Sequence, residues 1–198
     1  MHRQCKNLLL SLIPIGIHGL SVWFIYALKE QMTTIRCTQK LLKELRTQAD
    51  PEATADDSGW HANLLLFERR KCVLFTYDET LFSFFLCGLT RPDFARFSEV
   101  FDQGLFKALL QLDFGQAQVE RMLNKTSEIR LAKTNNRGVL GSMNNMKQML
   151  VWSISAADGL ENFGQADLTR LLNKTPSKAI GYDYPLERLR RLVSAETT

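Results

Sequence analysis

Three apolar runs joined by very short polar gaps are the feature that most constrains the fold of this chain. The runs cover residues 63–67, 72–77 and 81–87, and the gaps cover residues 68–71 and 78–80. Gaps of this length pair consecutive strands antiparallel, because a parallel crossover needs about a dozen residues or more. The runs are apolar at positions facing both sides of a sheet, so helices must cover it. We therefore expect an antiparallel β-meander with helices packed against it.

The flanking sequence supplies two further strands and the helices. Residues 33–37 and 127–134 alternate in the manner of strands. Helical periodicity is clearest in one aromatic and leucine stripe, which is typical of a core: Phe94, Phe97, Phe101, Leu105 and Leu109. These patterns predict a single α+β domain over residues 32–198, with the strands near residues 34 and 130 joined to the meander.

Composition and charge argue against several classes of function. Hydrophobic residues make up 45% and charged residues 23% of the 198 residues, which is ordinary for a globular protein. The net charge is +4 and no Lys/Arg run forms, which argues against a duplex-DNA footprint. The four cysteines form no Cys-x-x-Cys pair, a pattern typical of buried thiols in a reducing compartment. Of the three histidines only His61 lies beyond residue 31, so we expect no metal centre and no cofactor.

Residues 1–31 form a hydrophobic N-terminal extension. The apolar run 7–28 is long enough for a transmembrane helix, although Pro14 and two glycines weaken it. Met32 opens a sequence that resembles a natural protein start, so we expect the extension to come from a mis-assigned start. The alternative is a membrane anchor, and the Lys and Arg residues that follow the run would then keep the domain on the cytoplasmic side. Both interpretations predict a cytoplasmic domain, with membrane contact only if residues 7–28 are translated.

A polar, basic turn between the strand 127–134 and a helix at 139–155 is the strongest candidate for a ligand site. The turn consists of Lys133, Thr134, Asn135, Asn136 and Arg137. Cationic side chains beside the unpaired N–H groups of a helix N-terminus suit a phosphate or a carboxylate. The alternative is a solvated loop in which an asparagine caps the helix. Ser142, early in the same helix, lines the same pocket or only forms its solvent-facing side.

Trp60 and His61 precede the first apolar run. As the one imidazole in the predicted domain, His61 is a candidate general base. No Gly-x-Ser-x-Gly or Cys/His arrangement accompanies it, and the alternative is an inert, hydrogen-bonded histidine at a strand edge. Asp78 and Glu79 are candidates for holding a metal ion, but two adjacent carboxylates at a hairpin turn usually face water.

Several segments together resemble an uncharacterised bacterial family of small stand-alone proteins, a domain of unknown function. They are residues 35–43, 60–64, 69–75, 78–81, 132–137, 139–144, 171–176 and 184–185. The resemblance covers residues 32–193 and implies a single cytosolic domain with no established activity. It implies no catalytic residues. Gly138 stands where the family is expected to have Ser, which weakens a side-chain role at that position.

Two functions follow as hypotheses. The first is a binding module, without catalysis, for a small anionic ligand, a nucleic-acid end or a protein partner. The second is an enzyme that acts on a phosphorylated or nucleotide substrate with Lys133, Arg137 and His61. The enzyme requires these groups and Trp60 to converge in one pocket. The module predicts a concave polar patch with no base in reach, or an exposed apolar patch for a partner.

Overall fold

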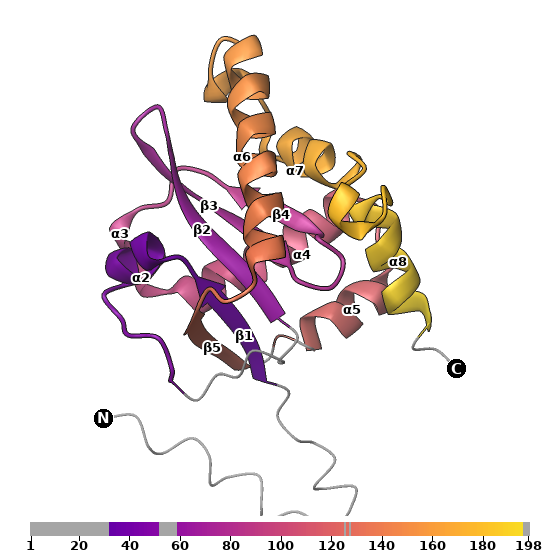
Figure 1. The fold of residues 1–198 in the computed structure, drawn as a ribbon, viewed down its shortest axis with the longest axis horizontal. Helices are drawn as coiled ribbons and strands as arrows, with labels where there is room; N and C mark the ends of the chain where they lie inside the picture. The colour runs from indigo at the N-terminus through magenta and orange to yellow at the C-terminus, as the bar shows by residue number, and fades with distance from the viewer. Residues whose placement is uncertain (1–31, 52–58, 125, 127, 196–198) are drawn as a thin grey trace, which may run out of the picture. The chain divides into compact units, whose positions relative to one another are not determined.

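The computed structural model describes residues 32–51, 59–124, 126 and 128–195. These residues form one α+β domain around a five-stranded sheet in the order β4-β3-β2-β1-β5 (Figure 1). The strands are β1 (Met32–Cys37), β2 (Gly59–Phe67), β3 (Arg70–Tyr77), β4 (Ser83–Leu86) and β5 (Glu128–Lys133).

Seven α-helices accompany the sheet in the described part of the chain. They are α2 (Gln39–Leu45), α3 (Arg91–Ala95), α4 (Phe97–Gln111), α5 (Gln116–Asn124), α6 (Arg137–Ala156), α7 (Gln165–Asn173) and α8 (Pro185–Ala195), with short 3-10 helices η1 (Leu160–Asn162) and η2 (Lys178–Ile180). None of these helices combines the length and the apolar character needed to cross a membrane. The predicted extension 1–31, with its apolar run 7–28, lies outside the described residues, as do residues 52–58.

The predicted meander is confirmed, but the prediction of a purely antiparallel sheet is wrong. β2, β3 and β4 pair antiparallel in sequence order. β1 pairs parallel with both β2 and β5. The reason is the length of the connections, because a chain that passes through a helix returns to the end of the sheet from which it started. α2 lies between β1 and β2, and α3, α4 and α5 lie between β4 and β5.

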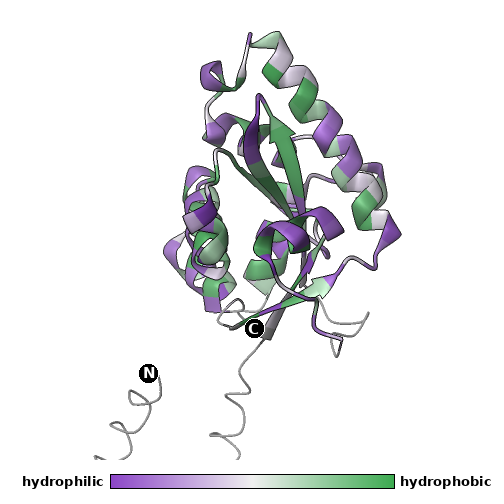
Figure 2. Cartoon of the chain, turned by 90° about the vertical axis from the view of Figure 1, so that its left-hand side faces the viewer, coloured by the Kyte–Doolittle hydropathy of each residue, from purple (hydrophilic) through white to green (hydrophobic). Residues whose placement is uncertain are grey.

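Helices cover both faces of the sheet, as its apolar runs require. α2, α3, α4, α5 and α8 pack on one face, here called the α4 face, and α6 and α7 pack on the other, called the α6 face. Figure 2 shows largely hydrophobic strands between helices that carry both hydrophobic and hydrophilic residues. On the α4 face, the ring of Phe101 lies 5.1 Å from that of Trp60 and 5.6 Å from that of Phe84. A large aromatic core therefore anchors α4 to the meander.

A buried side-chain amide fixes α7 beside β4. The Oδ1 atom of Asn173 accepts a hydrogen bond from the backbone N–H of Ser83 at 2.9 Å. Its Nδ2 atom donates to the carbonyl oxygens of Ser83 at 2.6 Å and of Thr169 at 2.7 Å. A buried amide that lacks a hydrogen-bond partner is costly. The three bonds made by Asn173 therefore hold α7 in place beside β4.

Candidate functional site

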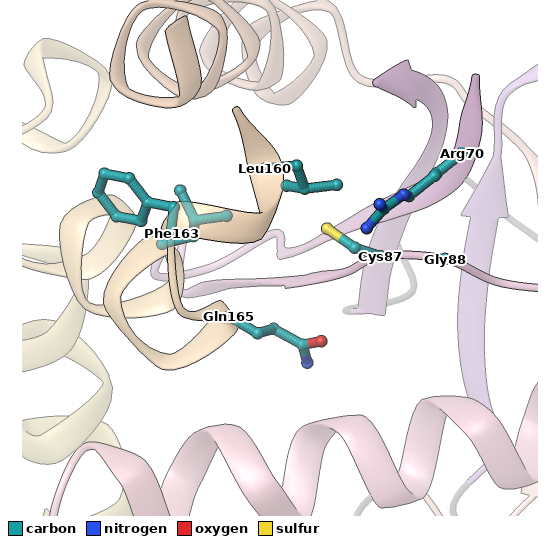
Figure 3. A pocket seen from close by; sticks show the side chains of 7 residues that line it. Arg70, Cys87, Gly88, Leu160, Phe163 and Gln165 are labelled. Carbon is teal, nitrogen blue, oxygen red and sulfur yellow. The ribbon is translucent and has the colours of Figure 1, made fainter. Parts of the chain in front are cut away.

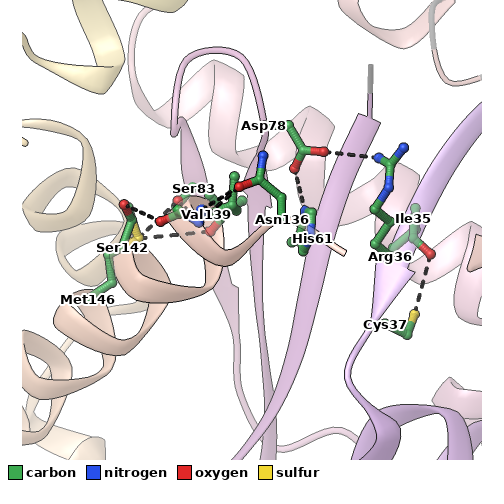
Figure 4. A network of polar contacts seen from close by, with 12 residues as sticks. Ile35, Arg36, Cys37, His61, Asp78, Ser83, Asn136, Val139, Ser142 and Met146 are labelled. Atoms are coloured by element: carbon green, nitrogen blue, oxygen red, sulfur yellow. Dashed lines mark hydrogen bonds and ion pairs between the residues drawn. The ribbon is translucent and has the colours of Figure 1, made fainter. Parts of the chain in front are cut away.

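A row of buried polar side chains crosses the α6 face of the sheet. Arg36 on β1 is the register partner of His61 on β2, which is the partner of Thr76 on β3, which is the partner of Ser83 on β4. All four residues are at most 1% exposed. The hydroxyl oxygens of Thr76 and Ser83 lie 2.9 Å apart. The sulfur atom of Met146 on α6 lies 3.3 Å from the hydroxyl oxygen of Ser83 (Figure 4). The row thus runs beneath α6 across four neighbouring strands.

Asp78 joins the row to form a buried ionic network. Its Oδ2 atom accepts a hydrogen bond from Nη1 of Arg36 at 3.0 Å, and its Oδ1 atom lies 2.5 Å from Nδ1 of His61 (Figure 4). Burying a charge is costly unless it is paired, and here the carboxylate serves both neighbours. Gly59 makes the arrangement fit, because a Cβ atom there would lie 2.3 Å from the carbonyl oxygen of Thr34 and 3.1 Å from Nη1 of Arg36.

The second ring nitrogen of His61 is the chemically notable atom of this network. Nε2 is buried and has no hydrogen-bond partner among the described residues. When Nδ1 donates its proton to Asp78, the neutral ring presents Nε2 as an acceptor. A carboxylate that orients an imidazole in this way is the arrangement used to prepare a general base. The ring is 0% exposed, so in this conformation Nε2 does not meet solvent.

The polar turn follows β5 and leads directly into α6. Its residues Lys133, Asn135, Asn136 and Arg137 are exposed, and Thr134 is half-buried. The side chain of Asn136 accepts hydrogen bonds from the backbone N–H groups of Gly138 at 2.9 Å and Val139 at 3.1 Å. Asn136 is therefore the N-cap of α6, which was the structural alternative considered from the sequence. Anion binding at the turn stays a prediction.

Ser142 connects the start of α6 to a cavity. Its hydroxyl donates to the carbonyl oxygen of Gly138, one helical turn earlier, at 3.1 Å. Ser142 therefore lies near the N-terminal end of α6. The cavity is about 110 Å³ and lies between α6 and the segment that joins α7 to α8. Its lining includes several hydrogen-bonding side chains and one cation: Ser142, Asn145, Thr175, Ser177 and Lys178.

The predicted site residues do not converge in one pocket. Trp60 lies on the α4 face among Tyr77, Phe84 and Phe101, whereas His61, the next residue of β2, lies on the α6 face. This separation follows from the alternation of side chains along a strand. β2 begins at Gly59, four residues before the predicted run, and this places both residues inside the strand. Trp60 is therefore a core residue, and only His61 lies on the same side as α6.

Two residues of the network were missed from the sequence. The sequence predicts only a short strand around Arg36, and it favours a water-facing carboxylate pair at Asp78 and Glu79. One signal was present: Arg36 is the one charged residue in the strand that ends at Cys37, at a position alternating with Ile35 and Cys37. Among the described residues, no group of three His, Cys, Asp or Glu side chains is placed to hold a metal ion.

The fold and the site together define an α+β domain with a mixed sheet, a buried Arg–Asp–His network and a polar turn at the start of its longest described helix. The chain matches the family described as Domain of unknown function (DUF6933) over residues 34–188. It belongs to that family, and the match confirms the resemblance seen in the sequence. Comparison with curated proteins and with solved structures gave no match.

Proposed function

We propose that this protein is a binding module for a small anionic ligand, which it contacts through the polar turn 133–137 and the adjoining cavity. Lys133 and Arg137 supply the positive charge. Both are exposed, and neither has an ion-pair partner in the part of the chain that the structure describes. Two uncompensated cations at the N-terminus of a 20-residue helix favour a phosphate or a carboxylate.

The position of Ser142 is the observation that carries this proposal. It lies one helical turn beyond the polar turn and in the wall of the cavity that contains Lys178. Ser142 thus connects the first turn of α6, which begins with Arg137, to the wall of a concave polar surface. Because Asn136 already accepts from two first-turn N–H groups, the ligand contacts are assigned to side chains, above all to Lys133 and Arg137.

A thermal-shift screen with inorganic phosphate, nucleotides and sugar phosphates tests the proposal. A ligand that binds only the folded protein stabilises it by about 2.7 kcal/mol at a hundredfold excess over the dissociation constant. The double variant Lys133→Ala/Arg137→Ala should lose this stabilisation. The matched control Lys107→Ala/Lys147→Ala removes the same charge from exposed helical positions and should keep it. If no anion stabilises the wild type, or if both double variants respond alike, the proposal is wrong.

The Asp78–His61 contact favours a second candidate function, an enzyme acting on a phosphorylated or nucleotide substrate. Its stated requirement is not met for Trp60, which lies on the opposite face of the sheet, so this enzyme would have to work without Trp60. In this hypothesis Nε2 of His61 is the general base, and Lys133 and Arg137 bind the phosphate. His61 is fully buried, so a substrate reaches it only when the start of α6 moves away from β2. Hydrolysis or transfer in the same screen, lost in His61→Gln, supports the enzyme. Ligand binding with no turnover supports the module.

A further inference from the structure

Cys72 and Cys87 face each other across the β3–β4 ladder. Val73 and Leu86 are register partners at the end of the two strands, and the same register continued by one residue places Cys87 opposite Cys72. The backbone N–H of Tyr77 donates to the carbonyl oxygen of Phe82 at 2.7 Å, so these two residues form a hydrogen-bonded pair. Hydrogen-bonded and non-hydrogen-bonded pairs alternate along an antiparallel ladder, which makes Cys72 and Cys87 a non-hydrogen-bonded pair. Cα atoms in such a pair lie about 4.5 Å apart, within the range that a disulfide spans.

The two thiols also interact directly. A hydrogen bond from Cys87 holds the pKa of Cys72 below its usual value, and the same bond raises the pKa of Cys87. The charge of Arg70 favours the thiolate at both positions. The two pKa values shift in opposite directions, so Cys72 is the more acidic thiol of the pair. The thiolate is the nucleophilic form of cysteine.

A cavity of about 130 Å³ gives access to this pair. It is lined by Arg70, Cys87, Gly88, Leu160, Phe163, Gln165 and Leu168. Figure 3 shows the sulfur atom of Cys87 between Leu160 and the guanidinium group of Arg70. A single water molecule occupies about 30 Å³ in the liquid, so the cavity has room for a small polar molecule. Cys72 is fully buried behind Cys87, which is only partly buried.

Cys37 shows what an unreactive thiol looks like in this fold. It lies on the α4 face, is 1% exposed, and its thiol donates to the carbonyl oxygen of Ile35 at 3.7 Å. Burial raises its pKa to about 12. The contrast between Cys37 and the pair is a contrast in neighbours, since only the pair has a second thiol, a cation and a cavity beside it.

We propose that Cys72 and Cys87 form an oxidation site, at which a small hydroperoxide entering the cavity converts the two thiols to a disulfide. Cys87 lines the cavity, so its sulfur attacks the terminal peroxide oxygen while its proton passes to the Cys72 thiolate, and the O–O bond breaks. The other oxygen leaves with a proton, as water or an alcohol, and the attacking sulfur becomes a sulfenic acid. The second thiol then attacks that sulfur, the S–S bond forms, and its proton leaves with the hydroxyl group as water. Two thiols are oxidised and one peroxide is reduced.

Peptide mapping of the full chain tests this site. Both cysteines lie in one tryptic peptide, residues 72–96, because Arg91 precedes a proline. The reduced protein is treated with hydrogen peroxide, unfolded, alkylated and digested. The expected product is peptide 72–96 without the alkyl label and with two hydrogen atoms fewer, while the Cys37 peptide stays labelled. Loss of label from 72–96 should be at least about tenfold faster than from the Cys37 peptide, as expected for thiols that differ in thiolate content. Dithiothreitol should restore the label.

Two controls make the result decisive. Cys37→Ala should form the same disulfide at the same rate, because Cys37 lies on the other face of the sheet. Cumene hydroperoxide, which is bulkier than hydrogen peroxide, should oxidise the pair more slowly if entry is through the cavity. The proposal is overturned if Cys72 and Cys87 remain fully alkylated, or if Cys87 goes to sulfinic acid without a disulfide. It is also overturned if Cys37 is oxidised as fast, or if both peroxides react at the same rate.

Discussion

Arg36 and His61 are register partners on neighbouring parallel strands, and both contact the carboxylate of Asp78. The three residues come from β1, from β2 and from the turn after β3. A single carboxylate therefore ties the parallel strand β1 to the antiparallel meander. A one-residue slip would turn every side chain of β1 to the other face, and a buried charged group that finds its partner in only one alignment helps to select that alignment.

Asp78→Ala should lower the free energy of unfolding by roughly 3 kcal/mol or more, because it removes the carboxylate that both Arg36 and His61 contact in the buried network. Denaturant unfolding measures this change. Glu79→Ala is the matched control: it removes the neighbouring carboxylate, which is exposed, and should cost less than about 1 kcal/mol. Equal effects of the two substitutions would mean that Asp78 contributes no more than a surface charge.

Phe84→Ala should cost about 3–5 kcal/mol in the same measurement. Phe84 is 1% exposed, and its ring lies within 6 Å of the rings of Trp60, Phe75 and Phe101. Leu66→Ala on strand β2 is the control, since Leu66 is 67% exposed and should change stability by less than about 0.5 kcal/mol. A loss below about 1 kcal/mol for Phe84→Ala would contradict the assignment of the core to this face.

The contribution of Asp102 on α4 to the free energy of unfolding should be less favourable at neutral pH than in acid. Burial raises the pKa of Asp102 above its ordinary value of 3.8, although a hydrogen bond from Thr126 opposes the shift. The folded protein thus binds the proton more tightly than the unfolded chain, and the stability from this group is lost as the pH rises through the raised pKa. Asp102→Asn should be more stable than wild type at pH 7, with a difference that disappears below about pH 3.8, as measured by unfolding at several pH values.

The contribution of Asp93 to stability should change with pH in the opposite direction, and the same unfolding experiment measures it. Hydrogen bonds from the side chain and the backbone N–H of Thr90 lower the pKa of Asp93. The resulting stability is present above the ordinary pKa of 3.8 and is lost as the pH falls through the lowered value. Asp93→Asn should therefore be less stable than wild type at pH 7, and the two should approach each other in acid. The same trend for both asparagine variants would contradict the environment described for one of the two residues.

Asn136→Ala should lower the free energy of unfolding by about 1 kcal/mol, because two N–H groups of α6 lose their acceptor. Asn135→Ala, one residue earlier and equally exposed, should have little effect. Thermal unfolding of the two variants in a buffer without phosphate or other polyvalent anions measures the capping contribution alone. Equal stability of the two variants would contradict the role of Asn136 as the N-cap of α6.

The strands and helices could be predicted from the sequence because their signals are local. The meander was found from three apolar runs, and α4 and α6 from residues repeating at helical spacing. The direction of β1 was not found, since its partners β2 and β5 are fixed by contacts between distant parts of the chain. A short strand such as Met32–Cys37 carries no local mark of being parallel or antiparallel.

The candidate site could be predicted only in part for the same reason. The polar turn is contiguous in sequence, and its cap at Asn136 follows from residue type. The Arg36–Asp78–His61 network is assembled from three segments, and nothing near Asp78 in the sequence shows that its carboxylate turns inward. His61 was noticed as the one imidazole of the domain, but its neighbours are set by the β1–β2 register, which only the folded sheet defines.

The hydrogen bonds between Asn173 and Ser83 also bear on how the protein behaves at high concentration. β4 is the last strand of the sheet, and Ser83 forms a non-hydrogen-bonded pair with Thr76, so its N–H and C=O point away from β3. These are the groups to which a strand of another molecule would add, and the amide of Asn173 already occupies both. One side chain thus blocks edge-to-edge aggregation along the outer side of β4, where an apolar strand would otherwise be a template for it.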